Sequence, residues 1–300
     1  CGLVGLKPTY GAVSRYGLIA MASSLDQIAP FARNTMDAAL TFEAISGHDS
    51  LDGTSKKDFS FHAKQVSDFS LESLRGLTVG LPKEYFISGI TKETQKEIDN
   101  AIATLRSLKV KFKEISLPHT EHALPCYYII MPAEISSNLA RFDGIRYGTR
   151  GELAPLTDTY PRNRGEGFGK EPKRRILLGN YVLSAGYYDA YYSQAQKVRR
   201  LITTDFTRAF DDVDIILTPT TPTPAFKFGE KTKDPVSMYL CDIFTVPVNL
   251  AGLPALSFPS RPSRSFGGGL PVGVQLIGKH FDEATLLGVS KWYEESVSSL

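Results

Sequence analysis

The residues whose types and spacing could bind a metal are His119 and His122, which stand three positions apart with Glu121 between them. On a helix this spacing would place both imidazoles on one face. Pro118 and Pro125 bracket the pair, however, and no further ligand follows at a suitable spacing. A solvated loop is the simpler interpretation, so the sequence predicts no metal site.

The glycine-rich run 165–169 (GEGFG) is similar to a phosphate-binding loop only in composition. It lacks the G-x-G-x-x-G spacing and follows no predicted strand. We expect a mobile or tightly turned loop there, because glycine permits positive φ. Lys7-Pro8-Thr9 completes no Walker motif either, since the preceding glycines are wrongly spaced.

Three serines near the start, Ser14, Ser23 and Ser24, are available as nucleophiles. A serine nucleophile needs a base and an oxyanion site. No His-Asp-Ser combination can be identified around them. The residues alone therefore identify no catalytic centre.

Composition sets the class of protein. The 300 residues are 42% hydrophobic and 22% charged, which is typical of a globular protein. The formal net charge of +2 argues against a polyanion-binding surface over the whole chain. Three cysteines without C-x-x-C spacing indicate reduced thiols rather than a disulfide framework. The first residues show no basic region followed by an apolar run, so they give no indication of export. No apolar run approaches the length of a membrane span.

The elements that would position a site alternate between helical and strand periods. Residues 35–46 and 91–109 predict helices, the second with apolar residues on one face. Residues 77–81 and 110–115 predict strands on either side of that second helix. Strand, helix and strand at this spacing indicate a crossover between parallel strands.

The middle of the chain reads as helical, at residues 124–142, 174–183 and 186–210. The tyrosines of the GYYDAYY run at 186–192 recur at helical spacing, and we expect them to pack in a core. The last third predicts strands at 214–217, 255–258 and 272–277, a proline-rich loop at 218–224, and a helix capped by Asp282. The fold class is therefore α/β, with helices layered on a central mixed, mostly parallel sheet.

Motifs along nearly the whole chain resemble those of a known protein family. They include GLKPTYG, VSRYGLIA, SSLDQI, FDGIRYG, EGFGKEPKRRILLG, PVNLAGLPA and LPVGVQLIGKHFDE. From Cys1 to about Tyr293 the chain resembles the amidase signature family, and within it the branch formed by the A subunits of glutamyl-tRNA(Gln) amidotransferase. This resemblance implies one α/β/α domain over residues 1–300, truncated at its N-terminus.

The resemblance also implies where the catalytic groups lie. Family members use a Ser-cisSer-Lys triad that attacks the side-chain amide of glutamine. The nucleophile lies just before the run that here begins at Cys1, and its two partners lie further upstream. No catalytic residue is therefore assigned in this chain, and Ser14, Ser23 and Ser24 match non-nucleophilic positions.

Recognition of glutamine is what the resemblance assigns to this chain. Arg175 matches the arginine that binds the α-carboxylate, which a planar guanidinium can grip through two hydrogen bonds. Asp242 matches the acid that meets the α-ammonium, and Tyr127 matches a tyrosine of the substrate pocket. From the residues alone, Arg174 and Arg175 could equally be a solvated helix start, Asp242 a helix cap and Tyr127 a core residue.

Partners follow from the resemblance as well. It implies a heterotrimer with amidotransferase subunits B and C, in which the B subunit uses ATP and magnesium to amidate misacylated Glu-tRNA(Gln), in the cytoplasm or an organellar matrix. No cofactor is expected in this chain. Two alternatives remain: a generic amidase with a hydrophobic amide substrate, and a non-catalytic fragment that only docks with partner subunits.

Overall fold

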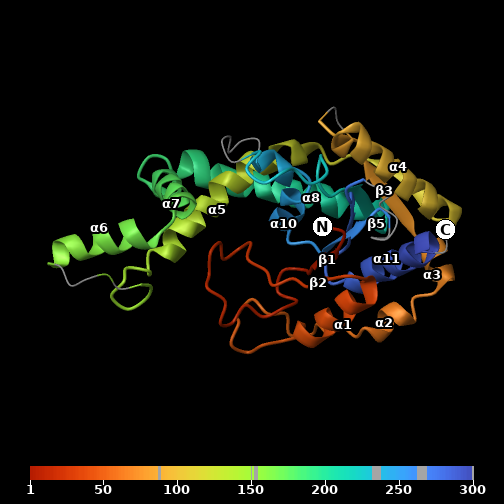
Figure 1. Ribbon diagram of the computed structural model, residues 1–300, viewed down its shortest axis with the longest axis horizontal. Helices are drawn as coiled ribbons and strands as arrows, with labels where there is room; N and C mark the ends of the chain where they lie inside the picture. Colours follow the sequence, from red (N-terminus) through yellow and green to blue (C-terminus); the bar gives the residue numbers. More distant parts are fainter. Residues whose placement is uncertain (87–88, 150, 152–154, 232–237, 262–268, 299–300) are drawn as a thin grey trace. The chain divides into compact units, whose positions relative to one another are not determined.

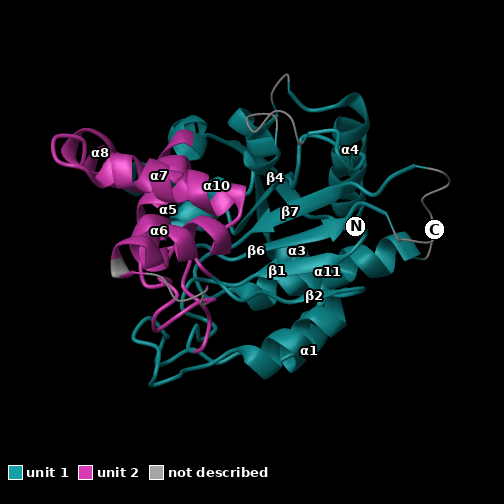
Figure 2. Ribbon diagram, turned by 60° about the vertical axis from the view of Figure 1, so that its left-hand side comes forward, with its two compact units in different colours: residues 1–16, 27–124, 200–300 teal, residues 17–26, 125–199 magenta. Residues whose placement is uncertain are grey.

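A computed structural model describes residues 1–86, 89–149, 151, 155–231, 238–261 and 269–298 (Figure 1). The chain forms two compact units (Figure 2). Unit 1 comprises residues 1–16, 27–124 and 200–300, and unit 2 comprises residues 17–26 and 125–199.

Unit 1 is built on a seven-stranded sheet in the order β2-β1-β6-β7-β5-β3-β4. The strands are β1 (Val4–Lys7), β2 (Phe31–Ala32), β3 (Thr78–Pro82), β4 (Lys111–Ile115), β5 (Ile215–Pro219), β6 (Ala255–Pro259) and β7 (Gly273–Ile277). The α/β class and the mixed sheet are confirmed. The strand at 4–7 was not predicted, because it is short and contains a glycine.

The expectation of a mostly parallel sheet is wrong. Only β3 pairs in parallel with its neighbours, β4 and β5, whereas the other described pairs are antiparallel. A parallel pair needs a long crossover, usually a helix, between its strands. Such a helix separates β3 from β4, but no described helix lies between β6 and β7, which pair in the antiparallel sense.

The helices of unit 1 pack on both faces of this sheet, because α10 (Val246–Ala251) lies on the face opposite the main core. The others are α1 (Thr35–Ile45), α2 (Lys64–Ser67), α3 (Leu71–Gly76), α4 (Lys92–Ser107) and α11 (Glu283–Ser298), with 3₁₀ turns η1 (Lys83–Tyr85), η2 (Pro118–His122) and η4 (Leu240–Asp242). α1, α2 and α11 lie side by side (Figure 1). The main core forms where strand residues such as Leu6, Leu256, Val274 and Leu276 meet α1, α4 and α11.

The predicted strand–helix–strand segment is confirmed as β3–α4–β4. Thr91 caps α4 by accepting a hydrogen bond from the backbone N–H of Thr94. The expected apolar stripe of α4 is buried, at Ile98, Ala101, Ile102 and Leu105. Asp282 also caps α11 as predicted, because the backbone N–H of Thr285 and its hydroxyl both donate to the Asp282 carboxylate, the hydroxyl over 2.7 Å.

Unit 2 is helical. It holds most of α5 (Ala123–Leu139), all of α6 (Leu156–Gly167) and α7 (Lys170–Leu183), a π-helical turn η3 (Asp189–Ser193) and the start of α8 (Gln194–Asp212). α5 and α7 confirm two predicted helices. α6 was not predicted, because Gly165 and Gly167 lie in its last turn, and the expected glycine-rich loop is largely a helix end.

The long helix predicted from Gly186 begins later. Gly186 adopts a φ of 86°, and the π-helical turn follows before α8 starts. Tyr187, Tyr188 and Tyr191 are 39–47% exposed, so the expectation that they pack in a core is wrong. They contact neighbouring tyrosine rings at the surface instead. Within the described ranges, no helix is long and apolar enough to cross a membrane.

Candidate functional site

Arg175 and Tyr127, two of the three predicted glutamine-binding residues, lie in unit 2. Arg175 is in the second turn of α7 and Tyr127 is near the start of α5. Arg175 donates from Nε to Oε1 of Glu171 over 3.0 Å and from Nη1 to Sδ of Met131 over 3.4 Å. Met131 is one turn after Tyr127 on α5, so the guanidinium is directed to the side of α5 that carries this tyrosine.

Arg174 and Arg175 differ in exposure. The side chain of Arg175 is 21% exposed, whereas that of Arg174 is 48% exposed and pairs with the other oxygen of Glu171 over 2.8 Å. A solvated helix start therefore describes Arg174 but not Arg175. Tyr127 is half-buried, and its ring meets that of Tyr128 edge to face.

A glycine allows α5 and α7 to approach so closely. A Cβ at Gly179 would overlap the carbonyl oxygen of Pro132 and lie 2.8 Å from Cβ of Ser136. The two backbones are therefore in direct contact one turn after Arg175. This contact sets the position of the guanidinium against Met131.

Asp242 is the third predicted residue and belongs to unit 1. It ends η4 and is exposed. Its carbonyl accepts hydrogen bonds from the backbone N–H and the hydroxyl of Thr245, which hold the turn before α10. Because Asp242 and the pair in unit 2 belong to different units, their assembly into one site remains a prediction.

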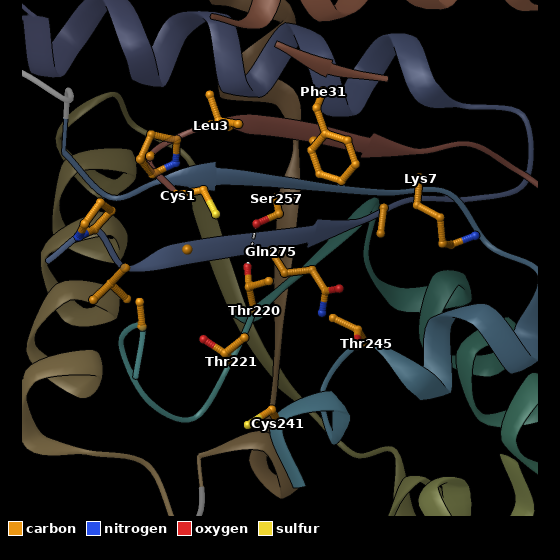
Figure 3. A pocket seen from close by; sticks show the side chains of 18 of the residues that line it. Cys1, Leu3, Lys7, Phe31, Thr220, Thr221, Cys241, Thr245, Ser257 and Gln275 are labelled. Carbon is orange, nitrogen blue, oxygen red and sulfur yellow. Dashed lines mark hydrogen bonds between the residues drawn. The ribbon is translucent and has the colours of Figure 1, made fainter. Parts of the chain in front are cut away.

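The sheet of unit 1 carries a cavity of about 530 Å³ on the face opposite the core (Figure 3). Side chains alternate between the two faces of a strand. Val274 and Leu276 of β7 thus enter the core, whereas Gln275 between them faces the cavity. The same alternation directs Gly5 of β1 and Ser257 of β6 to the cavity floor.

A row of polar side chains, Thr218, Gln275 and Ser257, crosses the floor of the cavity. Gln275 pairs in register with Thr218 of β5 on one side and with Ser257 on the other. Its Nε2 donates to Oγ1 of Thr218 over 2.7 Å and to the carbonyl of Phe244 over 3.0 Å. Phe244 is two residues after Asp242, so Gln275 anchors the segment that carries the predicted ammonium-binding acid.

Two glycines make room above the row. Ser257 shares a 2.8 Å hydrogen bond with Thr220, and a Cβ at Gly273 would lie 2.8 Å from Oγ1 of Thr220. The ring of Phe31 covers Gly5, where a Cβ would lie 2.7 Å from the ring. Larger residues at either position would displace the side chains that line the cavity.

Lys7 stands at the end of β1 and also lines the cavity. Its Nζ donates to the carbonyl of Pro8 and to Oε1 of Gln27, both over 3.0 Å. Burial lowers the pKa of Lys7 to about 7, against the opposing attraction of Glu283. Burial raises the pKa of Glu283, whose Oε1 accepts from the backbone N–H of Thr9 over 2.7 Å. This side of the cavity therefore holds an amine that titrates near neutral pH.

The other candidate residues have structural contacts. His119 lies in η2 and bonds through Nδ1 to the carboxylate of Asp205, and no cluster of metal-binding side chains occurs in the part of the chain that the structure describes. Ser14 donates to Asp49 over 2.6 Å, and Ser24 donates to Glu134 over 2.6 Å. These hydroxyls tie loops to neighbouring elements.

The sequence reasoning missed Lys7, Ser257 and Gln275 as site residues. The signal was present for Gln275, since it is the polar residue between two apolar ones in a predicted strand. Nothing in the sequence indicated that this face of the sheet bears a cavity. Lys7 could have been assigned to the same face only if strand β1 had been predicted.

Comparison with known proteins shows that this mixed sheet and its helices form the fold of an amidase. The amidase family model matches residues 1–287, and the chain belongs to this family. The A subunit of glutamyl-tRNA(Gln) amidotransferase from Carboxydothermus hydrogenoformans is 61% identical over 297 residues, or 99% of this chain and 60% of that protein. The corresponding subunit from Hahella chejuensis is 56% identical over 98% of this chain and 60% of its own length.

Solved structures agree with this assignment. The crystal structure of the A subunit of glutamyl-tRNA(Gln) amidotransferase from Thermotoga maritima matches with a TM-score of 0.75 and 40% identity, covering 97% of this chain and 57% of that one. Allophanate hydrolase from Kluyveromyces lactis matches with a TM-score of 0.75 and 25% identity over 99% of this chain and 43% of that one. The chain thus spans about 60% of the length of the curated relatives it matches.

Proposed function

We propose that this chain is the glutamine-recognising part of an amidotransferase A subunit, which hydrolyses glutamine and supplies ammonia for converting Glu-tRNA(Gln) to Gln-tRNA(Gln). Identity of 61% to such a subunit over 99% of the chain supports this proposal. Both units would then form one amidase domain over residues 1–300.

The position of Arg175 is the structural observation that carries the proposal. Its Nε and one Nη1 proton are used by Glu171 and Met131, and no described residue bonds to Nη2. The Nη1–Nη2 edge therefore keeps protons for a carboxylate, in the paired geometry that guanidinium favours. Asp242 would meet the α-ammonium group, and Tyr127 would line the pocket.

The rest of the reaction belongs to other parts of the complex. We propose that subunits B and C complete a heterotrimer in the cytoplasm, and that the B subunit uses ATP and magnesium on the misacylated tRNA. The Ser-cisSer-Lys triad is assigned outside these 300 residues. The chain alone should then release no ammonia from glutamine above background, because binding without the nucleophile leaves little catalysis.

Glutamine affinity tests the proposal directly. Isothermal titration of glutamine into the chain should show binding that weakens about ten- to a hundredfold in Arg175→Ala, because charge-assisted hydrogen bonds are lost. Arg174→Ala is the matched control, since Arg174 shares the partner Glu171 but is more exposed. Equal affinity in wild type and Arg175→Ala would contradict the glutamine site and favour the generic amidase.

A further inference from the structure

A lysine amine lies against a cysteine sulfur at the border of the cavity of unit 1. Nζ of Lys231 donates a hydrogen bond to Sγ of Cys241 over 3.0 Å, although the two residues are ten positions apart in the chain. Cys241 belongs to η4, and its half-buried side chain is one of those that line the cavity (Figure 3). Small reagents that enter the cavity can therefore reach this sulfur.

The ring of Phe226 helps to fix the position of the amine. Nζ of Lys231 lies 4.7 Å from the centroid of this ring, a distance at which an aromatic face attracts a cation. Phe226 lines the same cavity as Cys241. The end of the half-buried Lys231 side chain thus contacts both the ring and the sulfur, and these two contacts hold the nitrogen beside the sulfur.

The other two cysteines have different surroundings. Cys126 is buried and donates to the carbonyl of Ala195, and burial raises the pKa of its thiol to about 11. Cys1 is exposed, and no described residue forms a hydrogen bond with its thiol. Among the described contacts, an amine next to a sulfur that lines a cavity is therefore particular to Cys241.

This geometry suits a two-step oxidation. In the first step the sulfur of a thiol bonds to one oxygen of hydrogen peroxide, the O–O bond breaks and water leaves, so that sulfur loses two electrons and becomes a sulfenic acid. In the second step the lone pair of an amine forms an N–S bond, the S–O bond breaks, and the hydroxyl leaves as water with one amine proton. Reacting atoms about 3–3.5 Å apart are positioned for such a step, and the N–S distance here is 3.0 Å.

We propose that Cys241 and Lys231 form an oxidation-sensitive modification site, at which a peroxide converts Cys241 to a sulfenic acid and Lys231 then closes a sulfenamide bridge between Nζ and Sγ. One peroxide is consumed, the chain loses two hydrogen atoms, and two waters are released. An added thiol reopens the bridge by bonding to Sγ and releasing the amine. A second thiol then restores Cys241 and leaves as a disulfide.

The bridge would change the border of the cavity. It removes the positive charge of Lys231 and joins η4 covalently to the turn that carries this lysine. Asp242 directly follows Cys241, so the bridge restrains the segment with the predicted ammonium-binding acid. The further step, that oxidation changes glutamine affinity, rests on the proposed function.

Mass spectrometry of the Cys1→Ser chain tests the proposal, because this variant excludes a disulfide between Cys1 and Cys241. Hydrogen peroxide is added at pH 9, where a larger fraction of an exposed amine is neutral than at pH 7. We expect a product about 2 Da lighter than the reduced chain, with Lys231 joined to Cys241 and resistant to trypsin, and dithiothreitol should restore the starting mass. Complete tryptic cleavage after Lys231 in the oxidised chain would overturn the proposal.

Two lysine variants identify the amine. Lys231→Gln should lower the yield of the lighter product at least about tenfold and accumulate sulfenic acid, which adds about 16 Da. Lys227→Gln is the matched control, because Lys227 is an exposed lysine of the same loop whose side chain bonds to no described residue. It should form the bridge as the parent chain does. Equal yields in the two variants would show that Lys231 is not the reacting amine and would refute the site.

Glutamine titration separates this inference from the proposed function. If the bridge forms but leaves glutamine affinity unchanged, the modification site stands and its effect on glutamine binding is wrong. If glutamine binding depends on Arg175 and no bridge forms, the proposed function stands and the modification site is wrong. Cys241→Ser, treated with peroxide in the same way, corrects for oxidation elsewhere in the chain.

Discussion

Replacing Gly179 with alanine tests whether the contact between α5 and α7 positions Arg175. The new Cβ would overlap the carbonyl oxygen of Pro132, and it would lie 2.6 Å from the carbonyl carbon. Carbon atoms in contact are normally about 3.5–4.0 Å apart, so the helices must separate by about 1 Å. Such overpacking costs about 1–3 kcal/mol, which exceeds the gain of up to about 1 kcal/mol from better helix propensity.

Chemical denaturation measures this cost. We expect Gly179→Ala to lower the free energy of unfolding by about 2 kcal/mol. Gly165→Ala is the matched control, because Gly165 lies in α6 of the same unit and a Cβ there meets no atom within 4 Å. It should leave stability unchanged or raise it by about 0.5–1 kcal/mol.

The separation of α5 from α7 should also change the affinity for glutamine. An increase of about 1 Å would take Nη1 of Arg175 beyond hydrogen-bonding distance of Met131, now at 3.4 Å. Glutamine affinity should therefore fall in Gly179→Ala but not in Gly165→Ala. Equal stability and equal glutamine affinity in the two variants would refute the role assigned to this contact.

Two further predictions concern titratable groups. The pKa of Lys7 is lowered to about 7, so between pH 7 and 10 the unfolded chain binds more protons at this residue than the folded one. The stability of the wild type relative to Lys7→Met should therefore rise over this range, by up to about 1.4 kcal/mol per pH unit, and urea denaturation at several pH values measures it; a flat difference would contradict the shift. Burial raises the pKa of Cys126 to about 11, and its thiol donates to the carbonyl of Ala195 over 3.1 Å. A disulfide reagent at pH 8 should thus modify the exposed Cys1 within minutes and spare Cys126 until the chain unfolds, as followed by mass spectrometry; equal rates would show that Cys126 is accessible.

Regular periodicity explains which elements could be predicted. α4 has both a capping threonine and a clear apolar stripe, and β3 and β4 flank it closely, so the whole segment was found. α6 lacks an apolar stripe and ends in glycines, so local residue preferences pointed away from a helix. The tyrosines of residues 186–192 recur at helical spacing, yet Gly186 breaks the helix and their rings remain exposed.

The candidate site was predictable to different degrees. The resemblance selected Arg175, and the structure separates it from its neighbour Arg174 by exposure and by its bond to Met131. Periodicity could assign Gln275 to one face of its strand. It could not show that Thr218 and Ser257 flank it, because strand order and register depend on contacts far apart in the sequence.

The pairing of β1 with β6 has a consequence for synthesis of the chain. Gly5 is in register with Ser257, so one edge of β1 finds its partner only after about 250 further residues have been made. At about 5–20 residues per second, this takes roughly 13–50 s. During that interval β1 exposes an unpaired edge, which can pair with other chains. Slow translation, or a shortage of chaperones that bind nascent chains, should therefore favour aggregation through this segment.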